Sequence, residues 1–254
     1  MIGVGRVSGP LGPCVVRVEE NRVFDLTVSC PTIGHWLGGQ VSTAVLLKSA
    51  GTEMGTVDSV RWLAPFDIQP IKACGVTFIA SLLERLVEEL ARGQTDAADT
   101  IRQSFSTDFL QSLRDIRPGS PEALELREQL LARNQWSQYL EVGLGPDPEV
   151  FTKAPPMAAL VQGAEAGLLC DSTWNNPEPE IVLAINSLGE AVGASLGNDV
   201  NLRDVEGRSA LLLGRAKDNR GSTVIGPWIR VFDHDVNLQR LTSSELTLEI
   251  DGPD

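Results

Sequence analysis

The stretch NNPEPEIVLAINSLGEAVGASLGND, residues 175–199, carries the pattern from which the fold can be argued. Residues 181–186 form a nearly continuous apolar run of strand length, which predicts a strand buried on both faces. Residues 187–190 have the composition of a tight turn, and residues 191–196 form a second apolar run. The pattern predicts a β-hairpin with its loop centred between Leu188 and Gly189.

Three carboxylates fall at the open end of this hairpin. Glu178 and Glu180 lie two positions apart, so in extended backbone their side chains share a face, about 7 Å apart at Cβ. A symmetric loop pairs residues whose numbers sum to 377, which places Asp199 opposite Glu178. Three carboxylates without His or Cys suit Mg²⁺, Mn²⁺ or Ca²⁺ rather than zinc. We therefore predict a site for a hard divalent cation.

Other interpretations of these residues remain open. Acidic residues two apart also occur at positions 147 and 149 and at positions 233 and 235, where they fit a solvated surface. The pair at 178 and 180 differs because it adjoins an apolar strand, where uncompensated carboxylates are costly. Lys217 fits a surface lysine, but beside a dication charge repulsion would favour its neutral amine and suit it to proton abstraction. Lys153 fits either a substrate carboxylate or a surface salt bridge.

The chain divides into three predicted parts. Residues 1–70 contain short β-branched runs, including a hairpin of residues 15–18 and 23–28, and predict a small β-rich N-terminal domain. Residues 71–135 predict a helical connecting segment, with a helix over residues 82–90 and another that Ser120 caps ahead of Pro121. Residues 136–254 return to strands. The predicted fold class is α+β.

Composition excludes several classes of function. The 254 residues include 21 Lys or Arg and 34 Asp or Glu, so the net charge is −13. Phosphate backbones and anionic membrane surfaces would repel such a chain, so we expect neither nucleic acid nor a membrane as partner. Without a signal-peptide pattern or an apolar run of about 18 residues, we expect a cytoplasmic protein. The four cysteines form no CxxC pair and are interpreted as buried thiols.

Several longer motifs occur in the order found in one known family. They are KACGVTF (72–78), LERLVEELARG (83–93), WSQYLEVGLGPDPEVFTKAPP (136–156), STWNNPEPEIVLAINSLGEAVGASLGNDVNLRDVEGRSALLLGRAKDN (172–219) and GPWIR (226–230). Over about residues 70–250 the chain resembles the fumarylacetoacetate hydrolase superfamily, and within it the dehydratases of 2-keto-3-deoxy sugar acids. The resemblance implies a mixed β-roll of the fumarylacetoacetate hydrolase type in residues 136–254, with a helical insert before it.

The resemblance also implies a metal site and a proton-transfer residue. It implies that Glu178, Glu180 and Asp199 bind Mg²⁺, with Mn²⁺ as an alternative. It implies that Lys217 transfers a proton.

Four further residues are expected at the active site from the same resemblance. Glu149 and Lys153 belong to the family's E-x-F-x-K motif, with Glu149 as a catalytic residue and Lys153 at the substrate. Thr77 of the GVTF motif and Asn198 of the GND motif are expected to contact substrate.

The chemistry of a 2-keto acid agrees with these roles. A chelated Mg²⁺ stabilises the enolate that forms when a base removes a C3 proton, after which the C4 hydroxyl can leave. We therefore expect Mg²⁺-dependent dehydration of 2-keto-3-deoxy-pentonate to 2-oxoglutarate semialdehyde, by a homo-oligomer in the full-length form. The same enolate would serve a C–C bond hydrolase or a decarboxylase of a related 2-keto or diketo acid.

The last residues suggest a third possibility. Residues 246–250 alternate apolar and polar side chains, which predicts a half-buried strand, and DGPD follows as a turn without a return strand. We expect that the C-terminal part of the β-roll is missing and that the chain alone is an inactive or poorly active fragment.

Overall fold

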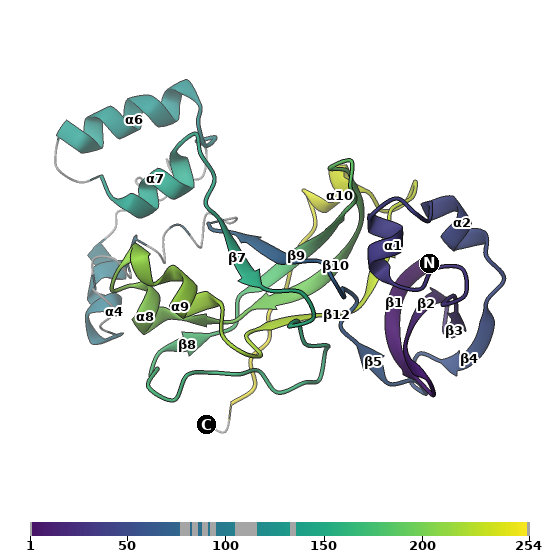
Figure 1. Cartoon of the computed structure of the whole chain (residues 1–254). Helices are drawn as coiled ribbons and strands as arrows, with labels where there is room; N and C mark the ends of the chain where they lie inside the picture. The colour runs from purple at the N-terminus through teal and green to yellow at the C-terminus, as the bar shows by residue number, and fades with distance from the viewer. Residues whose placement is uncertain are drawn as a thin grey trace.

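The main feature of the computed structural model is one continuous antiparallel sheet (Figure 1). The structure describes residues 2–76, 82, 86–87, 91, 95–104, 116–132 and 136–252. The strand order is β4-β3-β2-β1-β12-β10-β9, and β5 pairs with β1. These strands are β1 (Ile2–Gly9), β2 (Gly12–Glu19), β3 (Arg22–Asp25), β4 (Thr52–Thr56), β5 (Trp62–Leu63), β9 (Pro179–Ile185), β10 (Ala191–Asp199) and β12 (Thr223–Val231).

Two short sheets complete the strand inventory of the described residues. One pairs β6 (Ile71–Cys74) with β7 (Val150–Ala154), and the other pairs β8 (Asn175–Asn176) with β11 (Asn201–Leu202). Both pairings are antiparallel. Both short sheets lie at one end of the large sheet (Figure 1). Strand β6 directly precedes the helical segment, and β8 and β11 flank the β9–β10 hairpin in the sequence.

The sheet is continuous because β1 pairs with β12. Gly3 lies opposite Arg230, and Val4 lies opposite Ile229. A Cβ at Gly3 would overlap the indole ring of Trp228, so the glycine allows this ring to lie against β1. On the core side, Val4 and Ile229 join residues of both ends of the chain in one buried cluster. The predicted boundary at residue 70 stays a prediction, but the sheet itself crosses it.

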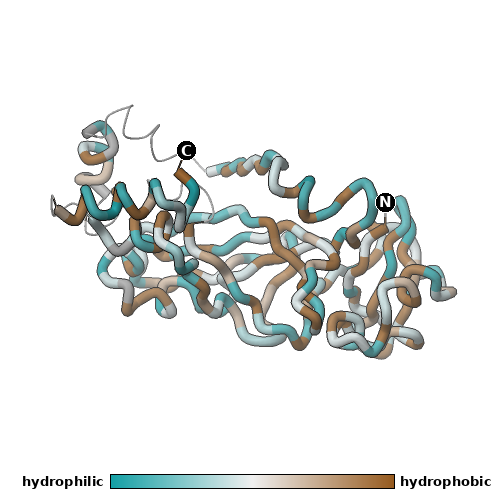
Figure 2. Tube along the Cα trace, turned by 90° about the horizontal axis from the view of Figure 1, so that it is seen from above, coloured by the Kyte–Doolittle hydropathy of each residue, from teal (hydrophilic) through white to brown (hydrophobic). Residues whose placement is uncertain are grey.

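The molecule is elongated (Figures 1 and 2), and its helices lie toward the two ends, except for the short helix of residues 238–241 near the middle. Two short helices cover the N-terminal strands, with Thr32 and Ser42 accepting hydrogen bonds as N-caps. The prediction of β-structure alone for this part missed them. The helices are α1 (Ile33–Leu37), α2 (Thr43–Lys48), α4 (Thr95–Ser104), α6 (Pro121–Ala132), α7 (Gln138–Leu144), α8 (Arg203–Glu206), α9 (Leu213–Lys217) and α10 (Leu238–Leu241), with the 3₁₀ turn η1 (Ala210–Leu212).

The structure confirms the predicted start of α6. Ser120 accepts a hydrogen bond from the backbone of Ala123 at 3.2 Å, and Pro121 occupies the first helical position. The helix predicted over residues 82–90 lies mostly outside the described residues. Its described members Leu82 and Leu86 are buried in one cluster with Leu140 of α7.

Three predictions about strands are wrong. Strand β9 is not buried on both faces: it is the last strand of the sheet, and Leu183 and Ile185 are 36% and 47% exposed. Residues 246–250 form no strand, because no described strand pairs with them. Strand β3 ends at Asp25 rather than at Val28, since the Asp25 carboxylate accepts a hydrogen bond from the N–H of Thr27 and turns the chain.

No described helix combines the length and the apolar character that crossing a membrane requires.

The cysteines differ in exposure, so their interpretation as four buried thiols is wrong. Cys30 is buried, Cys14 is intermediate, and Cys74 and Cys170 are exposed. Burial raises the pKa of the Cys30 thiol to about 11.

We expect iodoacetamide at pH 8 to label Cys74 and Cys170 in the folded protein and to leave Cys30 unmodified. The reason is that the thiolate is the reactive form and Cys30 is both inaccessible and protonated at that pH. Peptide mass spectrometry over time measures the label at each position. Labelling in urea is the control, and Cys30 reacting as fast as Cys170 in native buffer would contradict the structure.

Candidate active site

From Gly193 to Asn198 the β9–β10 hairpin has the register that the sequence predicts, whereas Ala191, next to the loop, pairs with Ile185 and is one residue out of that register. Pairs such as Ile181 with Leu196 have numbers that sum to 377. Just past the ladder, the N–H of Asp199 donates to the carbonyl of Glu178 at 2.9 Å. The Asn198 side chain accepts a hydrogen bond from the N–H of Glu178 at 3.0 Å. The prediction that Asp199 lies opposite Glu178 is therefore confirmed, while the expected substrate contact of Asn198 stays a prediction.

Lys217 lies between these two carboxylates. It is the last residue of α9, which packs on α8 through a cluster that includes Ala216 and Val205. The Nζ atom of Lys217 contacts Oε2 of Glu178 and lies 3.0 Å from Oδ2 of Asp199, and only 1% of the side chain is exposed. The two acidic residues that the sequence places opposite each other therefore share one buried cationic group.

A β-bulge directs Lys153 toward the same place. Ile71 pairs with Ala154 and Lys72 pairs with Thr152, so Lys153 is an additional residue in β7. The alternation of exposed and buried residues in β7 breaks at this point, because Lys153 and Ala154 are both buried. Without the bulge the two side chains would point to opposite faces.

Lys153 contacts both Asp199 and the last residue of α9. Its Nζ lies 3.0 Å from Oδ1 of Asp199 and donates hydrogen bonds to Val200 O and Ser222 Oγ at 3.0 Å, and to the carbonyl of Lys217. Burial lowers the pKa of Lys153, and the Asp199 carboxylate partly opposes this effect. An ammonium group has three protons to donate, and these acceptors of the protein occupy them. Substrate binding by Lys153 stays a prediction.

The sequence analysis missed a second group of polar residues behind Glu178. The Asn201 amide donates to Oε1 of Glu178 at 3.1 Å and also contacts the buried carboxylate of Glu206. Arg203 lies 3.2 Å from the same Oε1 atom. The signal for these residues was the polar run NDVNLRDVE (198–206), which starts with the last two residues of the GND motif and continues past Asp199.

The carboxylates fit a hard cation only in part. Glu178 and Asp199 are oxygen donors that already converge on a single cationic centre, the Lys217 ammonium. Glu180 lies on β9 opposite Gly197. Across the described part of the chain, no three Asp, Glu, His or Cys side chains are grouped as a ready metal site. The structure thus brings two of the three predicted ligands together, and Glu180 stays a prediction.

Glu149 immediately precedes β7 and lies beside Gly75. Its carbonyl accepts a hydrogen bond from the N–H of Gly75 at 3.0 Å, which extends the β6–β7 pairing by one residue. Its role as a catalytic residue stays a prediction. Thr77, the other residue expected here, lies outside the described residues.

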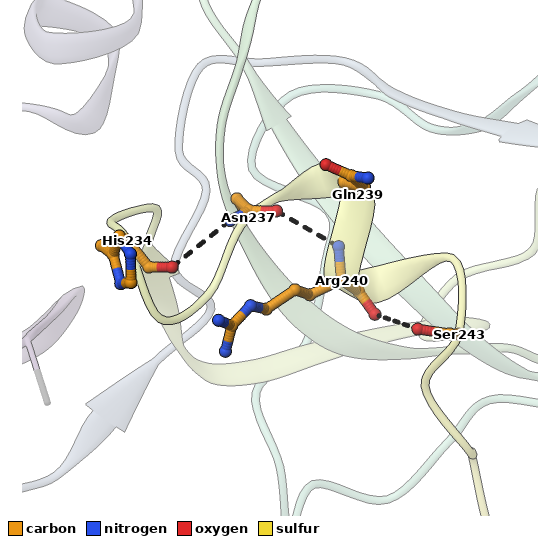
Figure 3. Close-up of a pocket in the computed structure, with 5 residues that line it drawn as sticks. All are labelled: His234, Asn237, Gln239, Arg240 and Ser243. Carbon is orange, nitrogen blue, oxygen red and sulfur yellow. Dashed lines mark hydrogen bonds between the residues drawn. The ribbon is translucent and has the colours of Figure 1, made fainter.

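A surface pocket at α10 is separate from this group of residues. It is lined by polar side chains of residues 234–243 (Figure 3), which are His234, Asn237, Gln239, Arg240 and Ser243. This segment follows the C-terminal end of β12, whereas Thr223 at the other end of that strand pairs with Asp199. The length of β12, about 3.3 Å per residue, separates the two places.

Comparison with known proteins shows which fold this chain has. The chain is 32% identical over 180 residues to a protein of Haloferax volcanii described as a probable 2-keto-3-deoxyxylonate dehydratase. The match covers 68% of this chain and 61% of that relative, so the chain spans about three fifths of it. A fumarylacetoacetate hydrolase from the psychrophile Exiguobacterium antarcticum has a similar structure, with a TM-score of 0.54 and 16% identity over 92% of this chain and 69% of that one. The chain has the fumarylacetoacetate hydrolase fold.

Further comparisons agree with this fold. A 2-keto-3-deoxy-D-arabinonate dehydratase, solved in complex with magnesium and 2,5-dioxopentanoate, has a TM-score of 0.56 and 17% identity. The similarity covers 91% of this chain and 66% of that structure. No family model matches the chain. The resemblance to the fumarylacetoacetate hydrolase superfamily and the α+β fold class are therefore confirmed.

Replacing Lys153 by Met tests its structural role. We expect Lys153→Met to lower the free energy of unfolding by about 3–5 kcal/mol, because Asp199 would lose a buried partner and three acceptors would lose their donor. Urea denaturation followed by circular dichroism measures the change.

Lys72→Met is the matched control for this substitution. Lys72 is exposed and donates only one described hydrogen bond, to Thr152 at 2.6 Å, so its replacement should change the stability by less than about 0.5 kcal/mol. Equal losses in the two variants would contradict the role that the contacts assign to Lys153.

Proposed function

We propose that this chain carries the active-site residues of a Mg²⁺-dependent dehydratase of 2-keto-3-deoxy sugar acids. The reaction would convert 2-keto-3-deoxy-pentonate to 2-oxoglutarate semialdehyde, which is also called 2,5-dioxopentanoate. The observation that carries the proposal is the buried amine of Lys217, held between Glu178 and Asp199. The names of the Haloferax volcanii relative and of the magnesium-bound structure support the class of reaction.

Glu178, Glu180 and Asp199 are the residues proposed to hold the cation. A bound Mg²⁺ would polarise the carboxylate and keto oxygens of the substrate and thereby stabilise an enolate. Support comes from the convergence of Glu178 and Asp199 on one cationic group. The Asn198 side chain accepts a hydrogen bond from the Glu178 N–H, and the Asn201 amide donates one to the Glu178 carboxylate, so the two residues would orient Glu178 for this task.

Lys217 is the proposed base that removes a proton from C3. In the structure its charge neutralises Glu178 and Asp199. Once another cation neutralises these carboxylates, charge repulsion would favour loss of the ammonium proton to water, and the neutral amine could then accept a proton from C3. Its burial against Phe151, whose ring centroid lies 5.6 Å from Nζ, keeps bulk water away from the amine.

Glu149 is the proposed acid that protonates the departing C4 hydroxyl, so that water leaves. The product of this step has a C3–C4 double bond conjugated with the keto group. Loss of a C5 proton and gain of one at C3 gives an enol, and protonation of that enol at C4 gives the aldehyde. The substrate loses one water overall, and the remaining protons are only relocated.

A thermal-shift titration tests the metal ligands directly. We expect Mg²⁺ to raise the Tm of the parent chain, by an amount corresponding to about 2.7 kcal/mol at 100 times Kd, and to leave the Tm of Glu178→Gln unchanged. Glu190→Gln is the matched control, because Glu190 lies in the exposed hairpin loop, where it contacts Asn186. Equal shifts in the parent and Glu178→Gln would remove the proposed site.

The reaction itself is tested by the appearance of the aldehyde product from 2-keto-3-deoxy-pentonate. We expect Lys217→Met to lower kcat by roughly 10²- to 10⁴-fold, because it removes the proposed base. A semicarbazide assay of the product measures the rate, and Lys72→Met serves as the control. Turnover of acylpyruvates, with no aldehyde formed from the sugar acid, would instead support the alternative of C–C bond hydrolysis.

A further inference from the structure

We infer that Gly75 is a positioning residue for Glu149, because it leaves the space that the Glu149 carboxylate occupies. The inference rests on the proposed function in one respect, the assignment of Glu149 as proton donor. It concerns a residue that lies between the strand β6 and the segment that begins at residue 77. Neither the sequence motifs nor the proposed chemistry gives Gly75 a task.

The two residues face each other at the end of a strand pair. Cys74 pairs with Val150, and one step further the N–H of Gly75 donates to the carbonyl of Glu149 at 3.0 Å. Directly opposed residues of an antiparallel pair have side chains on the same face, with Cβ atoms about 4.5–5.5 Å apart. A side chain on residue 75 would therefore project beside that of Glu149.

The Glu149 carboxylate uses the space that this missing side chain leaves. A Cβ atom built on Gly75 would overlap Oε2 of Glu149 and would lie 2.9 Å from its Cδ and 3.3 Å from its Cβ. Gly75 does not have a left-handed φ, so the backbone conformation does not require glycine here. The reason for a glycine is the close approach of the carboxylate.

The position of the Glu149 carboxylate is important because of the face of β7 on which this side chain lies. Glu149 and Phe151 are two residues apart and precede the bulge at Lys153, so in extended backbone their side chains lie on the same face. Phe151 contacts Lys217, and Lys153 contacts Asp199. The face that carries Glu149 is therefore the face whose Phe151 meets the proposed base, Lys217.

The substitution Gly75→Ala should move the carboxylate and keep the fold. The overlapping atom is at the end of a flexible side chain, so rotation of Glu149 relieves the conflict without a shift of the backbone. A misplacement of about 1 Å can cost on the order of 100-fold in rate. We expect kcat to fall by roughly 10- to 100-fold, with little change in KM.

A double-mutant cycle with Glu149→Gln separates a positioning role from a purely structural one. Glutamine has the same size but cannot supply the proton, so Gly75→Ala should lower kcat no further in the Glu149→Gln background. Gly214→Ala is the control, because a Cβ at Gly214 would enter open space. If Gly75→Ala folds poorly, the double variant with Glu149→Ala should recover most of the lost Tm, since Oε2 and Cδ, the two atoms nearest to the added Cβ, are then gone.

The outcomes distinguish this inference from the proposed function. A parent chain that turns over acylpyruvates but forms no aldehyde from the sugar acid would overturn the proposed function and with it the catalytic role of both residues. Two results would overturn the inference about Gly75 alone, provided that the parent and Glu149→Gln behave as proposed. In the first, Gly75→Ala has the same kcat as the parent. In the second, Gly75→Ala lowers kcat further in the Glu149→Gln background. Failure of Glu149→Ala to recover the Tm of Gly75→Ala would also overturn it.

Discussion

The arrangement of the site depends on one buried ammonium group shared by two carboxylates. Lys217 contacts Glu178 and Asp199 with almost no access to water. A buried charge without a partner is costly, so each of these groups is stable in its place only while the others are present. The same requirement extends to Lys153, which contacts Asp199 from the other side and also holds the backbone of Lys217. Charge pairing therefore fixes the relative positions of α9, β7 and the β9–β10 hairpin.

The large sheet supplies the rigid support for these charges. Strand β12 lies between β1 and β10, so it connects the N-terminal strands to the hairpin that carries Glu178 and Asp199. Its first residue, Thr223, pairs with Asp199, and Ser222 just before it accepts a hydrogen bond from Lys153. The proposed active-site residues thus lie at the ends of strands whose centres are packed in the core, where positions are set most firmly.

This arrangement suits a reaction that redistributes charge at a small substrate. The polar groups are held by one another and by the sheet before substrate arrives, which is the condition for electrostatic stabilisation at low reorganisation cost. Asn201, Arg203 and Glu206 extend the same contacts behind Glu178. Lys153 contacts Asp199, and Gly75 leaves the space that the Glu149 carboxylate occupies, so both residues help to fix the positions of proposed active-site carboxylates.

The sequence by itself determined the local features of this protein. The β9–β10 register from Gly193 to Asn198 agreed with the predicted loop position and the two-residue period of strands, and the start of α6 followed from Ser120 and Pro121. Only the tertiary structure decided which partners distant segments meet. The exposure of Leu183 depends on β9 being an edge strand, and the contact of Gly75 with Glu149 depends on the pairing of β6 with β7. Likewise, Lys153 meets Asp199 because a bulge turns it inward, and such non-local pairings leave no periodic pattern along the chain.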